Sequence, residues 1–577
     1  EQEAAGIRRS PALAAECAAP SYEDGGEDIY AEDVADAKRS VKFQKVPHPN
    51  DGVVPEALVY GGPVLDRALA LAFTFVLRMG LVPADWLSGA MRCVYKRGCS
   101  TVFTNFRGVV LTGHIAKLFE RVLLKRLLRV AGGVDEAQAV ANAPVDCRCQ
   151  LHLLYDVVLA NYGRVWLMAL DITRGFPSTS RALTVTALRR HGVGGRLLRA
   201  IIGLIHDTSV VVGLRPGVET RRVKLLVGLL EGAVLSPALF AFACSGLLRA
   251  LRESGLGVRL GQVHIPALML MDDLVLFARN RAELGAMAAV VFEWCWKNRF
   301  VLALAEKSHI LAPFPESAPD ETRLVWAPQG GEDAAAIDVT FPHRGALTYL
   351  GFVVSRGGGP DAHVLRQAGI ARRVIEKMEL EYGGRAAVTF NQALLMWTIH
   401  GRVHLEWPAA VLPPPLLRPN GQPGWDATMA YEQKQHRALA AILGKSAGGV
   451  LSHQTILAVF GLWRIDERRI VARARYAFVF SQTQRRPWRK SIFAELQARV
   501  GRDPHFRKQS VTGAIGAALK KLGLAWPGAA SVDSDNEEFG PFPRSRAEIE
   551  ADAMRWDAAA AAEAAAVRAG ADDATGA

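Results

Sequence analysis

The chain has 577 residues, half of them apolar, so it has room for several domains and can bury a large core. Lys and Arg outnumber Asp and Glu by 69 to 57, and this excess favours a polyanionic partner without proving one. The seven Cys include no CxxC pair, which indicates free thiols in a reducing compartment and speaks against a disulfide-stapled secreted protein.

The first fifty residues are rich in Ala, Glu, Asp, Pro and Gly and lack a sustained periodicity, which predicts a mostly disordered segment. The chain begins with Glu1 rather than Met and shows no secretory signal, so we expect a fragment whose upstream domains are missing. Neither long apolar run predicts a membrane span: residues 67–78 are too few, and residues 225–248 carry an acid and a proline near their middle.

Two short basic loops follow a helix expected at residues 65–77. Their sequences are Lys96-Arg97-Gly98 and Phe106-Arg107-Gly108. Such loops can hold phosphates because glycine lets the backbone approach a ligand closely, and ordinary surface charge is the alternative. In the helix expected at residues 115–129, cations recur every four residues on one face, which suits either a phosphate backbone or a solvated surface.

A buried strand is predicted at residues 165–170, and Asp171 ends it. An acid at the carboxyl end of a buried strand is well placed to bind a ligand. Further on, Ser178 or Thr179 is expected to cap a helix that runs to about Arg190.

The segment from Gly228 to Pro237 predicts a turn followed by a helix. Gly228 and Gly232 lie on either side of a polar residue, Glu231. Ser236 and Pro237 then open an apolar helix at residues 238–251, since proline is pre-organised for a helix start.

Residues 267–277 place Asp272 and Asp273 between two apolar runs of strand length, which predicts a buried β-hairpin with the acids at its turn. Side-by-side carboxylates repel each other unless a cation lies beside them, and hard oxygen ligands suit Mg²⁺. A solvated acidic turn is the alternative.

After the acidic hairpin, the sequence predicts a helix and further strands before a largely helical part. A helix at residues 281–298 precedes a lysine turn at Lys307, a strand at residues 309–312 and a strand pair that ends at Tyr349. From about Asp361 helices dominate.

The basic stretch from residue 464 to 508 interleaves cations with Tyr476, Trp488 and Phe506. This mixture suits a nucleic-acid backbone with stacked bases, and a basic helical surface is the alternative.

Cys147, Cys149 and His152 could form part of a zinc site, but the sequence offers no fourth ligand nearby. A metal site at this position is therefore the weaker interpretation.

In chain order, the basic loops, strand-end acid, glycine turn, acidic hairpin, lysine turn and Tyr-Leu-Gly strand resemble the fingers and palm of a reverse transcriptase of LINE-type (non-LTR) retrotransposons. The resemblance covers roughly Trp86 to Phe480. Its most specific parts are Asp171-Ile172-Thr173-Arg174-Gly175-Phe176, the segment from Glu231 to Phe240, Met271-Asp272-Asp273-Leu274 and Tyr349-Leu350-Gly351.

The resemblance implies an α+β right-hand polymerase, with fingers and palm built as an antiparallel sheet packed on helices, then a helical thumb and a basic C-terminal region. The expected parts are a disordered segment at 1–50, fingers at 51–164, the palm at 165–355, a helical thumb or connection at 356–480, the basic C-terminal region at 481–530, and an acidic linker with an Ala-rich tail at 531–577.

The resemblance also implies transfer of a nucleotide from dNTP to a primer 3′-hydroxyl, assisted by two Mg²⁺ ions, with Mn²⁺ as a substitute. Asp171 and Asp272 would supply the bridging carboxylates, Asp273 would be the less direct third acid, and the backbone carbonyl of Ile172 would be a further ligand. Lys307 would protonate the leaving pyrophosphate, or it is a surface lysine.

By the same resemblance, Lys96 and Arg107 would grip the triphosphate. Phe176 would exclude a 2′-hydroxyl, or it is a core aromatic. The floor beneath the template and incoming base would be shaped by Glu231, Gly232, Ser236 and Pro237, and the primer grip by Tyr349, Leu350 and Gly351.

The chain departs from the family pattern at several positions. Leu270-Met271 stands where an aromatic residue and Ala are usual, Glu231 where Gln is usual, Pro177 where Asp is common and Leu304 where Asn is usual. A catalytically decayed copy that only binds nucleic acid is therefore one alternative, and an RNA-dependent RNA polymerase is another. A helical interaction scaffold would leave the clustered acids unexplained.

The expected partners are an RNA template, a DNA primer or target, and dNTP, with no membrane partner. The expected location is intracellular, in the nucleus and cytoplasm, and not secreted.

Overall fold

The computed structural model of the chain describes residues 25–45, 52–96, 98–102, 105–140, 146–161, 164–215, 218–304, 308–313, 321–328, 337–343, 346–355, 361–382, 390–407, 409–412, 427–443, 452–459, 464–483, 487–524 and 526. Helices and strands both occur in this part of the chain, so the expected α+β class is confirmed. Lys307 and the tail at 531–577 lie outside the described residues.

The long helices predicted from apolar periodicity are present. They are α5 (Gly62–Met79), α6 (His114–Val130), α11 (Ser236–Glu253) and α12 (Arg281–Lys297). One cap differs from the prediction: the short helix α8 (Gly175–Ser178) ends first, and Ser180 caps α9 (Arg181–Arg190) by accepting the Leu183 N–H at 3.3 Å.

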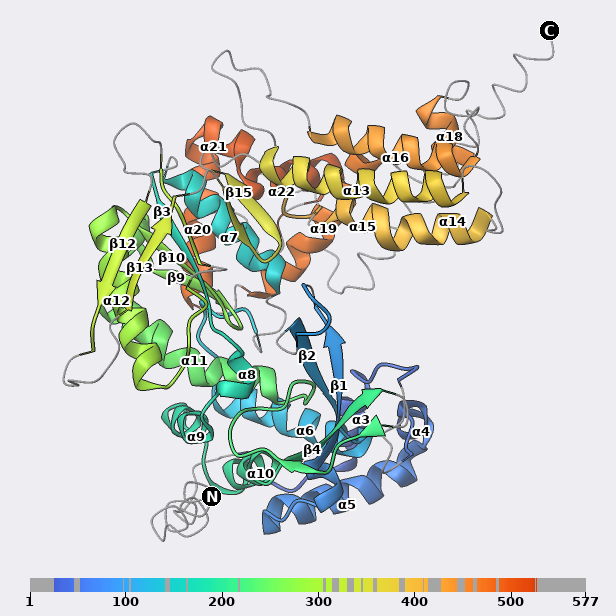
Figure 1. Cartoon of the computed structure of the whole chain (residues 1–577), viewed down its shortest axis with the longest axis vertical. Coiled ribbons are helices and arrows are strands. Elements are labelled where there is room, and N and C mark those ends of the chain that lie inside the picture. Colours follow the sequence, from blue (N-terminus) through green and yellow to red (C-terminus); the bar gives the residue numbers. More distant parts are fainter. Residues whose placement is uncertain are drawn as a thin grey trace, which may run out of the picture.

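A four-stranded antiparallel sheet occupies the middle of the chain (Figure 1). Its order is β11 (His309–Leu311), β3 (Trp166–Asp171), β10 (Asp273–Ala278) and β9 (Ala267–Leu270). Both β3 and β10 are apolar along almost their whole length because the sheet is covered on both faces.

The two faces of this sheet belong to two separate cores. Met168 and Leu276 pack in the first core, together with side chains of α11 and α12. Leu167 and Phe277 pack in the second core, with α7 (Cys147–Ala160) and the hairpin of β14 (Ala346–Tyr349) and β15 (Phe352–Ser355). The alternation of side chains along each strand produces this division.

A second sheet lies beside α5, α6 and α10 (Gly195–His206) in the lower part of Figure 1. Its strands are β1 (Ser88–Tyr95), β2 (Phe106–Leu111), β4 (Ser209–Arg215), β5 (Val218–Glu219) and β6 (Val223–Lys224). The pairing of β1 with β2 is antiparallel and that of β1 with β4 is parallel. Smaller hairpins join β7 (Val258–Leu260) to β8 (Val263–Ile265) and β12 (Glu321–Trp326) to β13 (Ile337–Pro342).

Helices form the C-terminal part, as expected. They are α13 (Asp361–Tyr382), α14 (Phe390–Met396), the π-helix η3 (Trp397–Arg402), α15 (Val403–Glu406), α16 (Ala427–Leu443), α18 (His453–Val459), α19 (Ile465–Thr483), α20 (Pro487–Arg502), α21 (Pro504–Gln509) and α22 (Val511–Lys521). Asp156 of α7 accepts the N–H groups of Val511 and Thr512 at 2.7 and 2.8 Å, so α22 is capped by a carboxylate from the middle of the chain.

The basic stretch at residues 464–508 does not present its aromatic residues as a stacking platform. Tyr476 and Phe506 are buried in the second core, and Trp488 is half-buried with its indole N–H donated to the His264 carbonyl at 3.0 Å. Arg489 is buried as well. The prediction that these aromatics stack on bases is therefore wrong, because their rings are packed against other parts of the protein and do not present a free face to a base.

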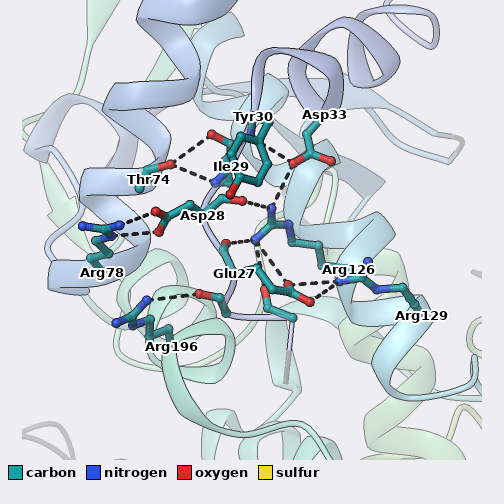
Figure 2. Close-up of polar contacts among 12 residues, drawn as sticks. Glu27, Asp28, Ile29, Tyr30, Asp33, Thr74, Arg78, Arg126, Arg129 and Arg196 are labelled. Carbon is teal, nitrogen blue, oxygen red and sulfur yellow. Dashed lines mark hydrogen bonds and ion pairs between the residues drawn. The ribbon is translucent and has the colours of Figure 1, made fainter. Parts of the chain in front are cut away.

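The expectation of disorder is wrong for part of the N-terminal segment. Residues 25–38, named here the N-terminal clasp, include α3 (Ala31–Lys38) and lie against α5 and α6. Figure 2 shows the Arg126 guanidinium at their centre: it donates to the carbonyl oxygens of Gly25 at 3.1 Å and Asp28 at 2.8 Å and to the Asp33 carboxylate at 3.0 Å. Composition could not reveal these contacts because their partners lie about a hundred residues apart.

In the part of the chain that the structure describes, no helix combines the length and apolar character needed to cross a bilayer. The boundaries between fingers, palm, thumb and C-terminal region stay predictions.

Candidate active site

The end of β3 and the turn between β9 and β10, named here the acid hairpin, bring three acids together. Asp273 is the register partner of Asp171 in the antiparallel pair β3–β10. Ile172 donates its N–H to the Asp272 carbonyl at 3.2 Å. Side chains directly opposite on an antiparallel pair share one face, with Cβ atoms about 5 Å apart. The strand-end acid and the acidic doublet therefore meet, although they are far apart in sequence.

The two acids of the doublet face different neighbours. Asp273 follows the alternation of Val275, so it lies on the face of the second core, and its charge adds to the burial that raises the pKa of Tyr349. Asp272 lies beside α8: a Cβ built on Gly175 would sit 3.4 Å from the Cβ of Asp272. Asp273 rather than Asp272 is thus the acid directly across from Asp171.

The backbone at the acid hairpin is strained. Met271, the residue before the doublet, has a φ of 57°, which a non-glycine residue adopts rarely and at an energetic cost. Such strain persists only where the surrounding structure enforces it, and it is typical of functional sites. Met271 donates its N–H to the Gln138 side chain at 3.0 Å, a contact that helps to hold this turn.

The donor chemistry of this site fits a hard divalent cation. Like charges directly opposite on a sheet repel each other, and carboxylate oxygens are the ligands that Mg²⁺ prefers. Among the described residues, no group of three His, Cys, Asp or Glu side chains is already arranged around a common point. The fit therefore rests on the Asp171–Asp273 pair, the adjacent Asp272 and the type of their donor atoms.

Residues 231–235, named here the floor loop, lie between β2 and α11. The Glu231 carbonyl accepts the Val110 N–H at 2.6 Å. Gly232 has a φ of 120°, and a Cβ there would approach the Val110 carbonyl oxygen to 2.3 Å, so only glycine fits. Ser236 and Pro237 begin α11 directly after this loop, as predicted.

Glu231 interacts electrostatically with two cations of the paired strands β1 and β2: Lys96 directly follows β1, and Arg107 lies within β2 rather than in the predicted loop. Burial raises the pKa of its carboxyl, Arg107 and Lys96 lower it, and Asp272 raises it further. These four charges are therefore close enough to influence one another. Lys96 and Arg107 both have exposed side chains, as residues that grip a triphosphate would need.

Phe176 is a half-buried aromatic in the short helix α8. Its ring stacks on Phe240 of α11 with centroids 5.2 Å apart, and its carbonyl accepts the Leu229 N–H at 2.9 Å. The core-aromatic interpretation and the sugar-excluding one both remain compatible with this position, because one face is packed and the residue is not fully buried.

The Tyr349 segment forms a tight hairpin. Leu350 and Gly351 have φ values of 50° and 76°, the left-handed pair that a two-residue hairpin turn requires. Tyr349 is only 2% exposed, and its hydroxyl has no hydrogen-bond partner among the described residues. The more accessible part of this segment is therefore the turn at Leu350 and Gly351, with Tyr349 packed beneath it.

The weaker metal interpretation at Cys147, Cys149 and His152 finds no support. The His152 ring bonds to the hydroxyls of Tyr476 at 3.2 Å and Thr512 at 2.8 Å. Burial raises the pKa of Cys149 to about 11, which keeps the thiol protonated. The hydrogen bonds of His152 connect α7 to α19 and α22.

Sequence reasoning missed the role of Val110 and Gly175. Val110 fixes the floor loop through its backbone, and Gly175 gives room to Phe240 and Asp272. The contact of Val110 is made by its backbone, so no side-chain pattern marks it, and Gly175 stands in the Asp171–Phe176 motif without any signal of the neighbours that its missing side chain accommodates.

Comparison with known proteins gives a family for the middle of the chain. Residues 94–354 match the family described as reverse transcriptase (RNA-dependent DNA polymerase). A retrovirus-related Pol polyprotein from the type-1 retrotransposable element R2 of Popillia japonica is 28% identical over 220 residues, which cover 37% of this chain and 31% of that protein. The corresponding protein of Nasonia vitripennis is 24% identical over 328 residues, which cover 54% and 30%.

The chain thus spans about a third of the length of these curated relatives. A solved structure of apo telomerase from Candida tropicalis is similar with a TM-score of 0.35 and 9% identity, over 74% of this chain and 68% of that chain.

Proposed function

Because the chain contains a reverse transcriptase domain at residues 94–354 and is distantly homologous to the R2 Pol polyproteins, we propose that it synthesises DNA on an RNA template as part of a non-LTR retrotransposon. The observation that carries the proposal is the register of β3 with β10, which sets Asp171 across from Asp273 and next to Asp272.

The acids would hold the metal ions of the reaction. Asp171, Asp272 and Asp273, with the Ile172 carbonyl, would bind two Mg²⁺ ions, or Mn²⁺ in their place. At this position the ions would lower the pKa of the attacking hydroxyl and stabilise charge on the leaving oxygen. The protein's part is to fix the acids at a strand end and a strained turn, so that their positions are set before substrate arrives.

The neighbouring residues would bind the substrates. Lys96 and Arg107 project exposed cations from the β1–β2 hairpin and would hold the triphosphate of dNTP. Phe176 would lie beneath the sugar, while the floor loop with Ser236 and Pro237 would support the template and incoming base. The turn at Leu350 and Gly351 would contact the primer, and Lys307 would donate a proton to pyrophosphate.

The test is primer extension on a primed RNA template with Mg²⁺, comparing dNTP with NTP and the wild type with Asp272→Asn. We expect extension with dNTP only, and a loss of about a thousandfold or more in the variant. Preferential use of NTP would favour an RNA-dependent RNA polymerase. Salt-sensitive RNA binding without extension by the wild type would favour a decayed copy.

A further inference from the structure

Glu120 is a buried carboxylate that no part of the proposed reaction uses. It lies on α6 and is only 6% exposed. One oxygen, Oε2, accepts the backbone N–H of Val234 at 2.5 Å and that of Leu235 at 2.9 Å. These two amides end the floor loop and lead into the first turn of α11.

The start of α11 has no cap of its own. Its N-cap residue is Leu235, whose side chain makes no capping hydrogen bond and is buried in the first core. Ser, Thr, Asp or Asn normally accepts the unpaired amides at this position. Here the acceptor comes from α6, more than a hundred residues earlier in the chain, so the same bond that caps α11 also joins two distant elements.

The choice of a carboxylate for this contact is energetically demanding. Burial raises the pKa of Glu120, while the Leu235 and Val234 amides and the nearby Lys117 and Arg121 lower it. A carboxylate shielded from water is retained where hydrogen bonds and a helix N-terminus compensate for the lost hydration. The contact therefore has to be made for Glu120 to be tolerated, which gives the loop a defined position relative to α6.

The other side of the floor loop is also fixed. The Glu231 carbonyl and the close approach of Gly232 attach it to Val110 of β2. Between the β2 contact and the Glu120 contact there are only a few residues, so the loop has little freedom once both are formed.

We propose that Glu120 is a positioning residue, which holds the floor loop in the place where it supports the template and incoming nucleotide. This inference rests on the proposed function, since only a polymerase would use the loop in this way. Loss of the contact leaves the acids of the reaction untouched and loosens the surface against which the nucleotide is aligned.

The experiment compares three variants of α6 in the full chain. Glu120→Ala removes both hydrogen bonds, Glu120→Gln keeps one acceptor oxygen, and Val122→Ala is a matched control that weakens the core on the same helix. Steady-state primer extension gives kcat and KM for dNTP, hydrogen exchange reports the Val234 and Leu235 amides, and thermal unfolding reports overall stability.

We expect Glu120→Ala to lower kcat/KM for dNTP by about tenfold to a hundredfold, mainly through KM, and to lose protection at both amides. Glu120→Gln should stay within about threefold of the wild type, because it can still accept the amides. Wild-type kcat/KM and protection in Glu120→Ala would overturn the proposal, as would an equal fall in kcat/KM in Val122→Ala. If Glu120→Ala does not fold, Glu120→Asp, which shortens the reach by one methylene, replaces it with the same expected direction.

Failure of the proposed function can be told apart from failure of this inference. If the wild type extends no primer, the polymerase proposal fails, and hydrogen exchange alone decides the role of Glu120. Lost protection at Val234 and Leu235 in Glu120→Ala would then support the positioning contact, and unchanged protection would overturn it.

Discussion

The N-terminal clasp and the acid hairpin both contain several charged side chains, and they differ in the sign of the charge next to each acid. In the clasp, Asp33 meets the buried guanidinium of Arg126 at 3.0 Å. In the acid hairpin, Asp273 meets a charge of its own sign, Asp171. In the clasp, opposite charges pair with each other, whereas in the acid hairpin two like charges lie directly opposite each other, and a divalent cation would offset their repulsion.

The same comparison shows what the cations of α6 contact. Lys125, on the face predicted to suit a phosphate backbone or solvent, is exposed and pairs with Asp36 of the clasp, and the nearby exposed Arg129 pairs with Glu27 at 2.9 Å. A basic helix face can therefore be used up by the chain's own acids.

The largest expected effect separates activity from stability at the acid hairpin. Asp171→Asn removes one of two facing like charges, so it should abolish primer extension by about a thousandfold or more while the free energy of unfolding without metal stays unchanged or rises slightly. Extension rates and chemical unfolding measure the two quantities. Asp338→Asn on β13, an exposed acid, is the control and should leave extension at the wild-type rate. A large fall in the free energy of unfolding of Asp171→Asn would contradict the claim that the acid hairpin, unlike the clasp, serves activity rather than stability.

The clasp should show the opposite behaviour. Arg126→Met leaves Asp33 and several backbone carbonyls without their partner, so we expect a loss of about 3 kcal/mol in the free energy of unfolding. Arg129→Met should lower the free energy of unfolding by less than about 1 kcal/mol, because the Arg129 side chain is exposed. Urea unfolding gives both values, and equal losses would mean that burial of Arg126 has no energetic consequence.

Replacing Glu231 should strengthen nucleotide binding. Burial raises the pKa of Glu231, which means that the folded protein favours the neutral carboxyl. The buried charge therefore does not lower the free energy of unfolding below pH 4.5, and it lowers this free energy most above the raised pKa. Glu231→Gln removes the charge beside Asp272 and should lower KM for dNTP by about threefold to tenfold. The stability of this variant relative to the wild type should grow as the pH rises from 4.5 through the raised pKa of Glu231 and stay constant above it. A pH-independent difference would contradict the assigned burial effect.

The smallest expected effect is on the salt dependence of RNA binding, and it compares Arg107 with Lys125, a cation that already pairs with an acid of the clasp. Arg107→Ala should reduce the slope of log affinity against log salt by about one unit if this exposed cation contacts a phosphate, as we propose. Lys125→Ala should leave the slope unchanged because Asp36 already neutralises this lysine. Filter binding over a salt series would detect either result, and equal slopes for both variants would remove the distinction between the two regions.

Short-range sequence patterns, such as apolar runs and a proline at a helix start, predicted the helices and strands better than the contacts around the candidate active site. The strand ending at Asp171, the acid hairpin and the start of α11 follow from apolar runs and from the preference of Pro for helix starts. Their convergence depends on strand register, which the family resemblance supplied and composition could not.

The features that sequence analysis missed all depend on contacts between distant residues. Glu120 has no unusual neighbours in sequence, and its role becomes visible only when the floor loop packs against α6. Tyr476 and Phe506 have the composition of a stacking surface, yet they are buried by helices that lie elsewhere in the chain. Side-chain type alone does not tell whether an aromatic or a cation faces water.

The most direct test of the account is a Mn²⁺ titration followed by electron paramagnetic resonance, on the wild type and Asp171→Asn with primer, RNA template and a non-hydrolysable dNTP. We predict two bound ions in the wild type with the spin coupling of a pair roughly 3.5–4 Å apart, and loss of that coupled pair in the variant. A wild type that binds no ion pair, or a variant that binds the pair equally well, would contradict the claim that the acid hairpin and Asp171 form one metal site.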